Sequence, residues 1–171
     1  MQLSVVTELP TEGGQAMPIS ARIKNHLEEN KIRYSLLTHP SAYTAQGAAA
    51  VMHVPGGEVA KTVVVEAGKD YYLVVLPASY HMNPGRLAHL IGRPVRLATE
   101  TEFSSLFPDC ELGAMPPLGE LYGLGVYVDE SLAADKEIIF NAGTHRDAIR
   151  MEFDDFVSLA RPTVCSFAAK G

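Results

Sequence analysis

The feature that most constrains the fold is a pair of apolar runs separated by a short turn. Residues 61–65 read KTVVV, and residues 71–77 form a second, largely apolar run. The connection between them, at residues 67–70, contains Gly68. β-branched and aromatic residues favour strands, and a short connection with glycine favours a hairpin. We therefore predict a β-hairpin in this part of the chain.

Helices and further strands are predicted on both sides of the hairpin. Ser20 can cap a helix in which Ile23 and Leu27 lie four residues apart on one face. Thr99 can cap another, with Glu102 at the position that completes a capping box. The predicted helices span residues 20–30, 83–91, 99–107 and 152–159, and another starts at Ser41 or Thr44 and runs through residues 45–52. The further predicted strands span residues 32–37, 95–97, 125–129 and 137–141.

Length and composition indicate a single soluble domain. The chain has 171 residues, of which 47% are apolar and 20% are charged, and it has no apolar run near the ~18 residues that cross a bilayer. Residues 1–16 contain no Lys or Arg before an apolar core, so they do not indicate a secretory signal. We expect a cytoplasmic protein without a membrane partner. It would comprise a flexible leader at 1–16, a folded domain at 17–163 and a C-terminal tail at 164–171.

The charge limits the kind of nucleic acid that the chain can hold. Fourteen Lys and Arg against twenty Asp and Glu give a net charge of −6. This balance argues against a protein that grips DNA or a long RNA through many phosphates, because such binding depends on clustered positive charge. An RNA substrate would be contacted locally or delivered by a partner.

Common catalytic and cofactor motifs are missing from the sequence. Its six histidines form no HExxH, and its two cysteines, Cys110 and Cys165, form no CxxC, so no metal site is indicated. The sequence contains no phosphate-binding GxxxxGK[ST], no GxGxxG after a strand and no GxSxG nucleophile elbow. We expect no cofactor and two free thiols.

Three segments are candidates for chemistry, each with a simpler structural alternative. Lys61 opens a predicted strand after a glycine-rich turn, although most lysines at such positions are solvated surface charges. The sequence GAMPPLG at 113–119 can present backbone N–H groups to an oxyanion, and a purely structural loop fits equally well. Gly143 would set His145 at a strand end, where a histidine is more often a turn residue than a catalyst.

Four motifs, in order, resemble the YbaK/EbsC family, which includes the editing domain of bacterial prolyl-tRNA synthetases and its free-standing relatives. They are VAKTVVV at 59–65, GAMPPLG at 113–119, VYVDE at 126–130 and NAGTH at 141–145. The similarity covers roughly residues 18–162. It implies a single domain of mixed α/β class, with a curved, largely antiparallel sheet wrapped by helices.

The resemblance also implies roles for individual residues. Lys61 matches the family's functional lysine, which holds the terminal adenosine of tRNA and its phosphate, and Gly113 matches a loop glycine whose N–H polarises the ester carbonyl. His145 matches a position that bounds the amino-acid pocket, and Asp129 matches an acidic position with a structural or supporting role. The other residues expected at the substrate are Thr62, Ala114, Met115, Pro116, Pro117 and Gly143, with Asn141 supporting them.

We therefore predict an ester hydrolase that acts in trans on mischarged tRNA. The expected substrate is tRNA for proline that carries alanine, cysteine or a similar small amino acid. A synthetase or an elongation factor is an expected partner because of the negative net charge. Two alternatives stay open: a non-catalytic module that binds a tRNA end or a nucleotide, and a regulatory interaction protein on the same fold.

Overall fold

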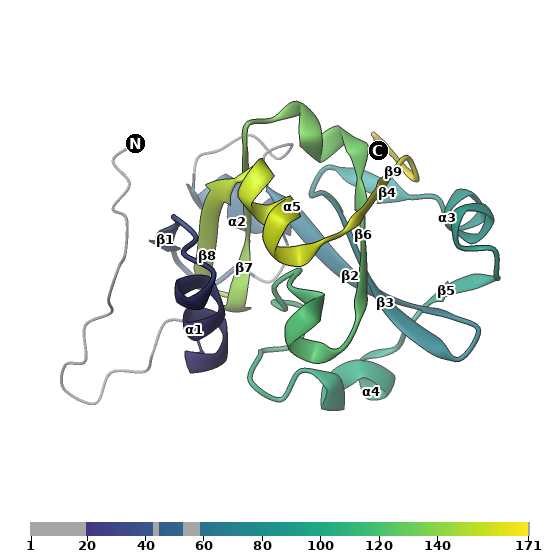
Figure 1. Cartoon of the computed structure of the whole chain (residues 1–171), viewed down its shortest axis with the longest axis horizontal. Coiled ribbons are helices and arrows are strands. Elements are labelled where there is room, and N and C mark those ends of the chain that lie inside the picture. The colour runs from purple at the N-terminus through teal and green to yellow at the C-terminus, as the bar shows by residue number, and fades with distance from the viewer. Residues whose placement is uncertain (1–19, 43–44, 53–58, 171) are drawn as a thin grey trace.

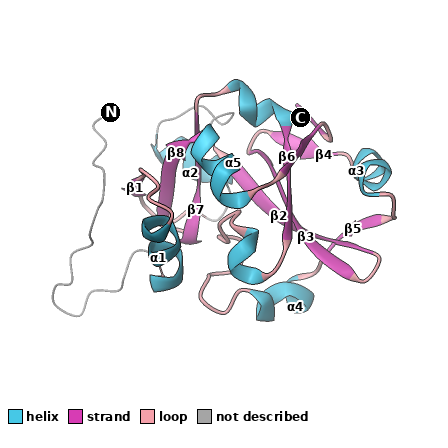
Figure 2. Ribbon diagram, in the orientation of Figure 1, coloured by secondary structure: helices cyan, strands magenta, loops and turns pink. Residues whose placement is uncertain are grey.

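The computed structural model describes residues 20–42, 45–52 and 59–170 (Figure 1). The leader expected at residues 1–16 lies outside the described residues. The fold is of the predicted mixed α/β class (Figure 2). Its helices are α1 (Ala21–Glu29), α2 (Ala45–Met52), α3 (Pro84–Ile91), α4 (Glu100–Phe103) and α5 (Phe153–Ala160). None of the described helices is long and apolar enough to cross a membrane.

A five-stranded sheet is built on the predicted hairpin. The hairpin pairs β2 (Ala60–Ala67) with β3 (Asp70–Pro77), in register from Ala60 opposite Pro77 to Ala67 opposite Asp70. The sheet order is β5-β2-β3-β6-β9, with β5 (Val95–Leu97) antiparallel to β2. The strand β6 (Gly125–Asp129) pairs in parallel with β3, and β9 (Thr163–Cys165) pairs in parallel with β6. The hairpin prediction is confirmed.

A three-stranded antiparallel sheet lies beside it. Its order is β1-β8-β7, from β1 (Ser35–Thr38), β8 (Asp147–Glu152) and β7 (Glu137–Thr144). A single parallel bridge between Val59 and Ile139 connects the start of β2 to β7. The strand β8 was not predicted, whereas β1 and β7 overlap the predicted strands with shifted ends.

The two faces of the hairpin pack against different cores. Ala60, Val64 and Val75 belong to the larger core, which includes Phe156 of α5. Val65, Val74 and Leu76 face the other way, toward Leu87 of α3 and Phe167. This division follows from the strand geometry, because successive side chains point to opposite faces. Lys61 and Thr62, as neighbours on β2, therefore lie on opposite faces of the sheet.

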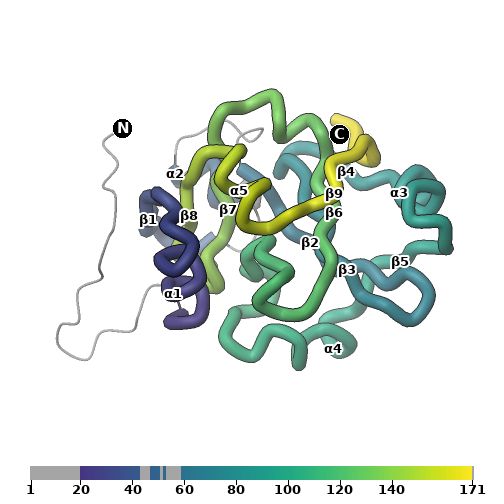
Figure 3. The backbone as a smooth tube through the Cα atoms, in the orientation of Figure 1, coloured from purple at the N-terminus to yellow at the C-terminus, as the bar shows by residue number. Residues whose placement is uncertain are grey.

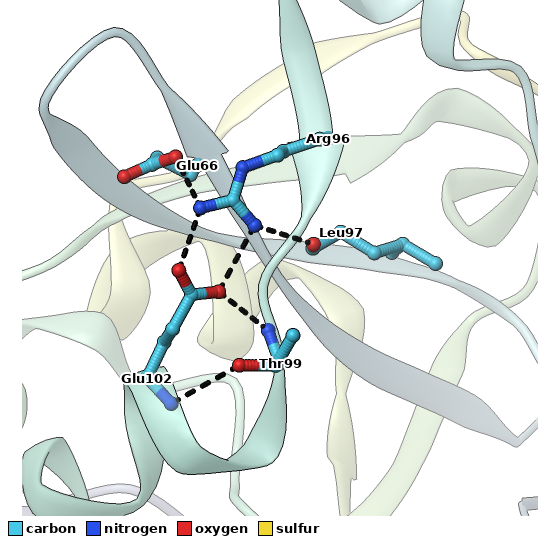
Figure 4. Close-up of polar contacts among 5 residues, drawn as sticks. All are labelled: Glu66, Arg96, Leu97, Thr99 and Glu102. Atoms are coloured by element: carbon cyan, nitrogen blue, oxygen red, sulfur yellow. Dashed lines mark hydrogen bonds and ion pairs between the residues drawn. The ribbon is translucent and has the colours of Figure 1, made fainter.

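The capping box predicted for α4 is present and is reinforced by an arginine from β5 (Figure 4). Thr99 Oγ1 accepts from Glu102 N–H, and Thr99 N–H donates to Glu102 Oε1. Arg96 donates to both oxygens of Glu102 at 2.9 and 2.6 Å and lies 2.6 Å from Glu66 on β2. The hydrogen bond from Arg96 is the main reason that the pKa of Glu102 falls to about 2. The helix is shorter than predicted, since the chain continues as a 3-10 turn, η2 (Ser104–Leu106).

Residues 164–170, which we expected to form a tail, belong instead to the folded domain. The strand β9 pairs with β6, and β10 (Ala168–Lys170) pairs with β4 (Tyr80–Met82), so the chain end returns to the sheets (Figure 3). The Phe167 side chain between the two strands is fully buried. Asp129 holds this segment, because its Oδ1 accepts from the N–H groups of Phe167 and Ala168, each at 2.9 Å.

We expect Asp129→Asn to destabilise the fold. The buried carboxylate also accepts from Ser131 N–H and Oγ, and an amide cannot satisfy all of these donors. The expected loss in the free energy of unfolding is about 1.5–3 kcal/mol, as for hydrogen bonds to a charged group. Urea unfolding measures it, with the exposed Asp154→Asn as the control. Equal midpoints for the two variants would contradict this structural role.

Candidate active site

The glycine loop, which we define as residues 111–115, is hydrogen-bonded to the end of β7. Glu111 N–H donates to Gly143 O at 2.8 Å, and Gly143 N–H donates to Ala114 O at 2.9 Å. The Glu111 carboxylate then accepts from His145 N–H at 2.6 Å. Two segments that are about thirty residues apart in sequence are thus joined by backbone and side-chain bonds, which fix the loop against the strand.

A bulge in β7 allows this close approach. The pairing of β7 with β8 shifts between Asn141 and Thr144, and Gly143 has a φ of +97°. A side chain at Gly143 would begin 3.4 Å from Ile23 of α1 and 3.7 Å from Cys110 Sγ. Glycine therefore permits both the left-handed backbone and the tight packing against α1.

The loop has an exposed rim and a buried base. Glu111, Leu112 and Gly113 are exposed, whereas every residue from Ala114 to Gly119 is buried. Met115 and Leu118 lie in the larger core, and Pro116 and Pro117 restrict the backbone between them. The base holds the loop in place and leaves the backbone of Gly113 accessible.

His145 packs directly beneath this rim. Its ring Nε2 lies 2.8 Å from Leu112 O, and its Cε1 lies 3.4 Å from the position that a Cβ on Gly113 would take. Gly113 has a φ of +87°, and its N–H donates to Met115 Sδ at 3.2 Å. Sulfur is a weak acceptor, so an oxygen atom placed there would bind this N–H more strongly.

Lys61 lies where the two sheets meet. It follows Val59, whose parallel bridge to Ile139 joins the start of β2 to β7. Its side chain is half-buried, and burial lowers its pKa below that of an ordinary lysine. The Lys61 side chain makes no hydrogen bond or ion pair with any residue that the structure describes. Its ammonium is therefore not held by a described carboxylate.

Thr62 lies on the other face of β2 from Lys61. Its neighbours Ala60 and Val64 share the larger core with Met115 and Leu118. The structure brings some of the predicted residues together and separates others. Gly113, Ala114, Met115, Gly143 and His145 are connected by direct contacts. Asp129 lies apart from them, at the C-terminal strands.

Several residues that support the site were not predicted. Asp147 accepts from Thr144 Oγ1 at 2.5 Å and from Thr38 Oγ1 at 3.2 Å, which fixes the turn around His145. Ala42 N–H donates to His145 O at 3.0 Å. No feature of the sequence points to a role for Glu111. For Asp147, the only available signal is an aspartate in a short turn.

Asp109 anchors the start of the loop to α1. Its carboxylate accepts from Ser20 Oγ at 2.7 Å and from Tyr122 O–H at 3.1 Å, and Ser20 also caps α1 as predicted.

Burial raises the pKa of the Cys110 thiol, next to Asp109, to about 12, so Cys110 is unsuited to act as a thiolate nucleophile. Both cysteines are free, as predicted. Among the described residues, no cluster of His, Cys, Asp and Glu is arranged to hold a metal ion.

Similarity to known proteins identifies the family. The profile described as aminoacyl-tRNA editing domain matches residues 39–159. The chain belongs to the aminoacyl-tRNA editing domain family. The matched span includes Lys61, the glycine loop and His145, so the family relation predicted from four motifs is confirmed. No curated protein matches the sequence.

Several solved structures share this fold. A proposed trans-editing enzyme for prolyl-tRNA synthetase is 25% identical, with a TM-score of 0.79 over 91% of this chain and 99% of that one. The hypothetical protein APE2540 is 23% identical, with a TM-score of 0.79 over 86% of this chain and 99% of that one, and shows the fold alone. The fold also occurs in a proposed signal transduction protein from Marinobacter aquaeolei VT8, at 16% identity and a TM-score of 0.71. There the similarity covers 88% of this chain and 31% of the longer one.

Proposed function

We propose that this member of the editing domain family is a trans-acting aminoacyl-tRNA deacylase. The observation that carries the proposal is the glycine loop, in which Gly113 is exposed while its neighbours are bonded to Gly143 and His145. A fixed backbone donor is suited to an ester carbonyl, because a transition-state oxyanion needs a donor that is already oriented. The family and the trans-editing relative support the same class of reaction.

The reaction requires no nucleophilic side chain. Gly113 N–H would leave Met115 Sδ and bind the carbonyl oxygen, which becomes negative as water attacks. The bond between the carbonyl carbon and the ribose oxygen then breaks. One proton of the water ends on that ribose oxygen, and the amino acid leaves as its carboxylic acid. The substrate's own 2′-hydroxyl or amine can position the water, so the protein supplies mainly orientation.

Lys61 supplies the contact to the tRNA end in this proposal. Its ammonium makes no ion pair within the described residues and is therefore available for the phosphate of the terminal adenosine. Its strand begins beside β7, because Val59, two residues before Lys61, bridges Ile139 of β7. Binding the phosphate there and the carbonyl at Gly113 would fix both sides of the ester.

The amino-acid side chain would lie against His145 and Met115. Both residues are buried and contact Gly113, so a small side chain fits better beside the loop than a large one. We therefore propose tRNA for proline carrying alanine or cysteine as the substrate. The net charge of −6 favours delivery of that tRNA by a synthetase or an elongation factor.

Incubation with a panel of charged tRNAs tests the proposal. We expect alanine or cysteine to be released from tRNA for proline much faster than in buffer, and proline to be retained. Alanine on its own tRNA serves as the control for tRNA identity. If every ester decays at the buffer rate, with and without elongation factor, the protein is not a deacylase and the binding-module alternative gains support.

A further inference from the structure

We propose that His145 is a positioning residue that orients and polarises the Leu112–Gly113 peptide. The starting point is the contact between His145 Nε2 and Leu112 O at 2.8 Å. A carbonyl oxygen can only accept a hydrogen bond, so Nε2 must carry the proton. This holds for the neutral Nε2–H tautomer and for the cation alike.

The acceptor and the proposed catalytic donor belong to one peptide group. Leu112 C=O and Gly113 N–H are joined by a planar amide, so a bond that turns one also turns the other. A hydrogen bond to the carbonyl oxygen draws electrons through the amide and makes its N–H a stronger donor, since bonded groups polarise one another. His145 would thus act on the ester through the Leu112–Gly113 peptide without touching the carbonyl.

The environment of the peptide explains why it needs such a support. Leu112 and Gly113 are exposed, so core packing does not fix this part of the loop. Gly113 has a φ of +87°, which glycine adopts easily, but glycine can also adopt many other backbone conformations. The ring of His145 restricts those alternatives, with its Cε1 in close contact below Gly113.

His145 itself is well fixed. Its N–H donates to Glu111 Oε1 at 2.6 Å, and its carbonyl accepts from Ala42 N–H at 3.0 Å. Only 8% of the residue is exposed. A buried ring on a backbone held from both sides can keep an exposed peptide in one orientation, which is the arrangement that preorganised donors require.

Two substitutions separate the hydrogen bond from the bulk of the ring. His145→Gln keeps an N–H donor near the Nε2 position, whereas His145→Leu keeps apolar volume without a donor. The role in deacylation rests on the proposed function. In that reaction, His145→Leu should lower kcat by about 10- to 100-fold, as for a misplaced catalytic group. His145→Gln should restore most of kcat, and the buried His26→Leu controls for lost stability.

A spectroscopic readout tests the contact without any substrate. The sequence contains three Leu–Gly peptides, at 112–113, 118–119 and 124–125. Labelling leucine carbonyls with 13C and glycine nitrogens with 15N gives one NMR correlation for each. We expect His145→Leu to move the 112–113 correlation and leave the other two in place, with His145→Gln close to the wild type.

The outcomes distinguish this inference from the proposed function. If the wild-type protein hydrolyses no tested ester, the proposed deacylase function is wrong. The 112–113 correlation still decides whether His145 acts on the peptide. An unmoved correlation in His145→Leu overturns the inference even if the protein is an active deacylase. Equal kcat in the Leu and Gln variants, or a change in KM alone, also counts against it.

Discussion

Lys61→Ala is expected to lower kcat/KM for a mischarged tRNA by about 100-fold. The ammonium would lose a charge-assisted contact to phosphate, and such contacts contribute about 1.5–3 kcal/mol. The fold should remain intact, because the Lys61 side chain makes no hydrogen bond or ion pair with the residues that the structure describes. Single-turnover deacylation measures the loss, and thermal unfolding checks that the variant is folded.

A matched control lies on the same hairpin. Lys69 is exposed at the turn between β2 and β3, away from the junction of the two sheets. Lys69→Ala should keep full activity if the position of the charge matters. A fully active Lys61→Ala would remove this residue from the proposed mechanism, and equal losses in both variants would indicate a general effect of positive charge.

The pH dependence of binding gives a second test of Lys61. Burial lowers its pKa below the ordinary value of 10.5. Binding of a phosphate is complete where the lysine is charged and is lost as the pH rises through that pKa. We therefore expect the affinity for a non-hydrolysable aminoacyl-tRNA analogue to fall as the pH rises. The fall should begin at a lower pH than it would if the contact were made by a lysine of ordinary pKa. Lys61→Arg should remove this alkaline loss, because arginine stays charged throughout.

The elements predicted best are those encoded by nearby residues. The hairpin of β2 and β3 follows from local alternation and a short turn, and α3 begins at Asn83 and Pro84 as expected. The strand β8 was missed because Asp147, Arg150 and Glu152 obscure its apolar pattern. It forms a tight hairpin with β7 and also pairs with β1, which lies far earlier in the chain, so the local sequence does not reveal that second pairing.

Sequence analysis named candidate site residues but could not predict how they are arranged. Glycines at 113 and 143 indicated unusual backbone, yet the bonds from Glu111 to Gly143 and His145 depend on a bulge that no local pattern reveals. Strand periodicity places Lys61 and Thr62 on opposite faces, which separates two residues that sequence analysis had grouped at the substrate. The C-terminal strands were missed for the same reason, since Asp129 binds them from 38 residues away.

Gly113→Ala is expected to lower kcat by about 100-fold, the effect of losing one oriented oxyanion donor. Alanine is strained at a φ of +87°, and its Cβ would meet His145 Cε1 at 3.4 Å. Relief of that strain, which costs about 1–3 kcal/mol, would turn the Leu112–Gly113 peptide away from the ester. Pre-steady-state deacylation reports kcat directly, and KM should change little because Lys61 still holds the tRNA end.

Gly123 provides a control, because it also has a positive φ but lies outside the glycine loop. Its φ is +70°, and a Cβ there would meet no atom within 4 Å. Gly123→Ala should therefore carry a similar conformational cost in unfolding experiments while keeping its kcat. If both variants lose activity equally, strain alone explains the loss. If Gly113→Ala stays fully active, the carbonyl must be polarised by a group other than this backbone N–H.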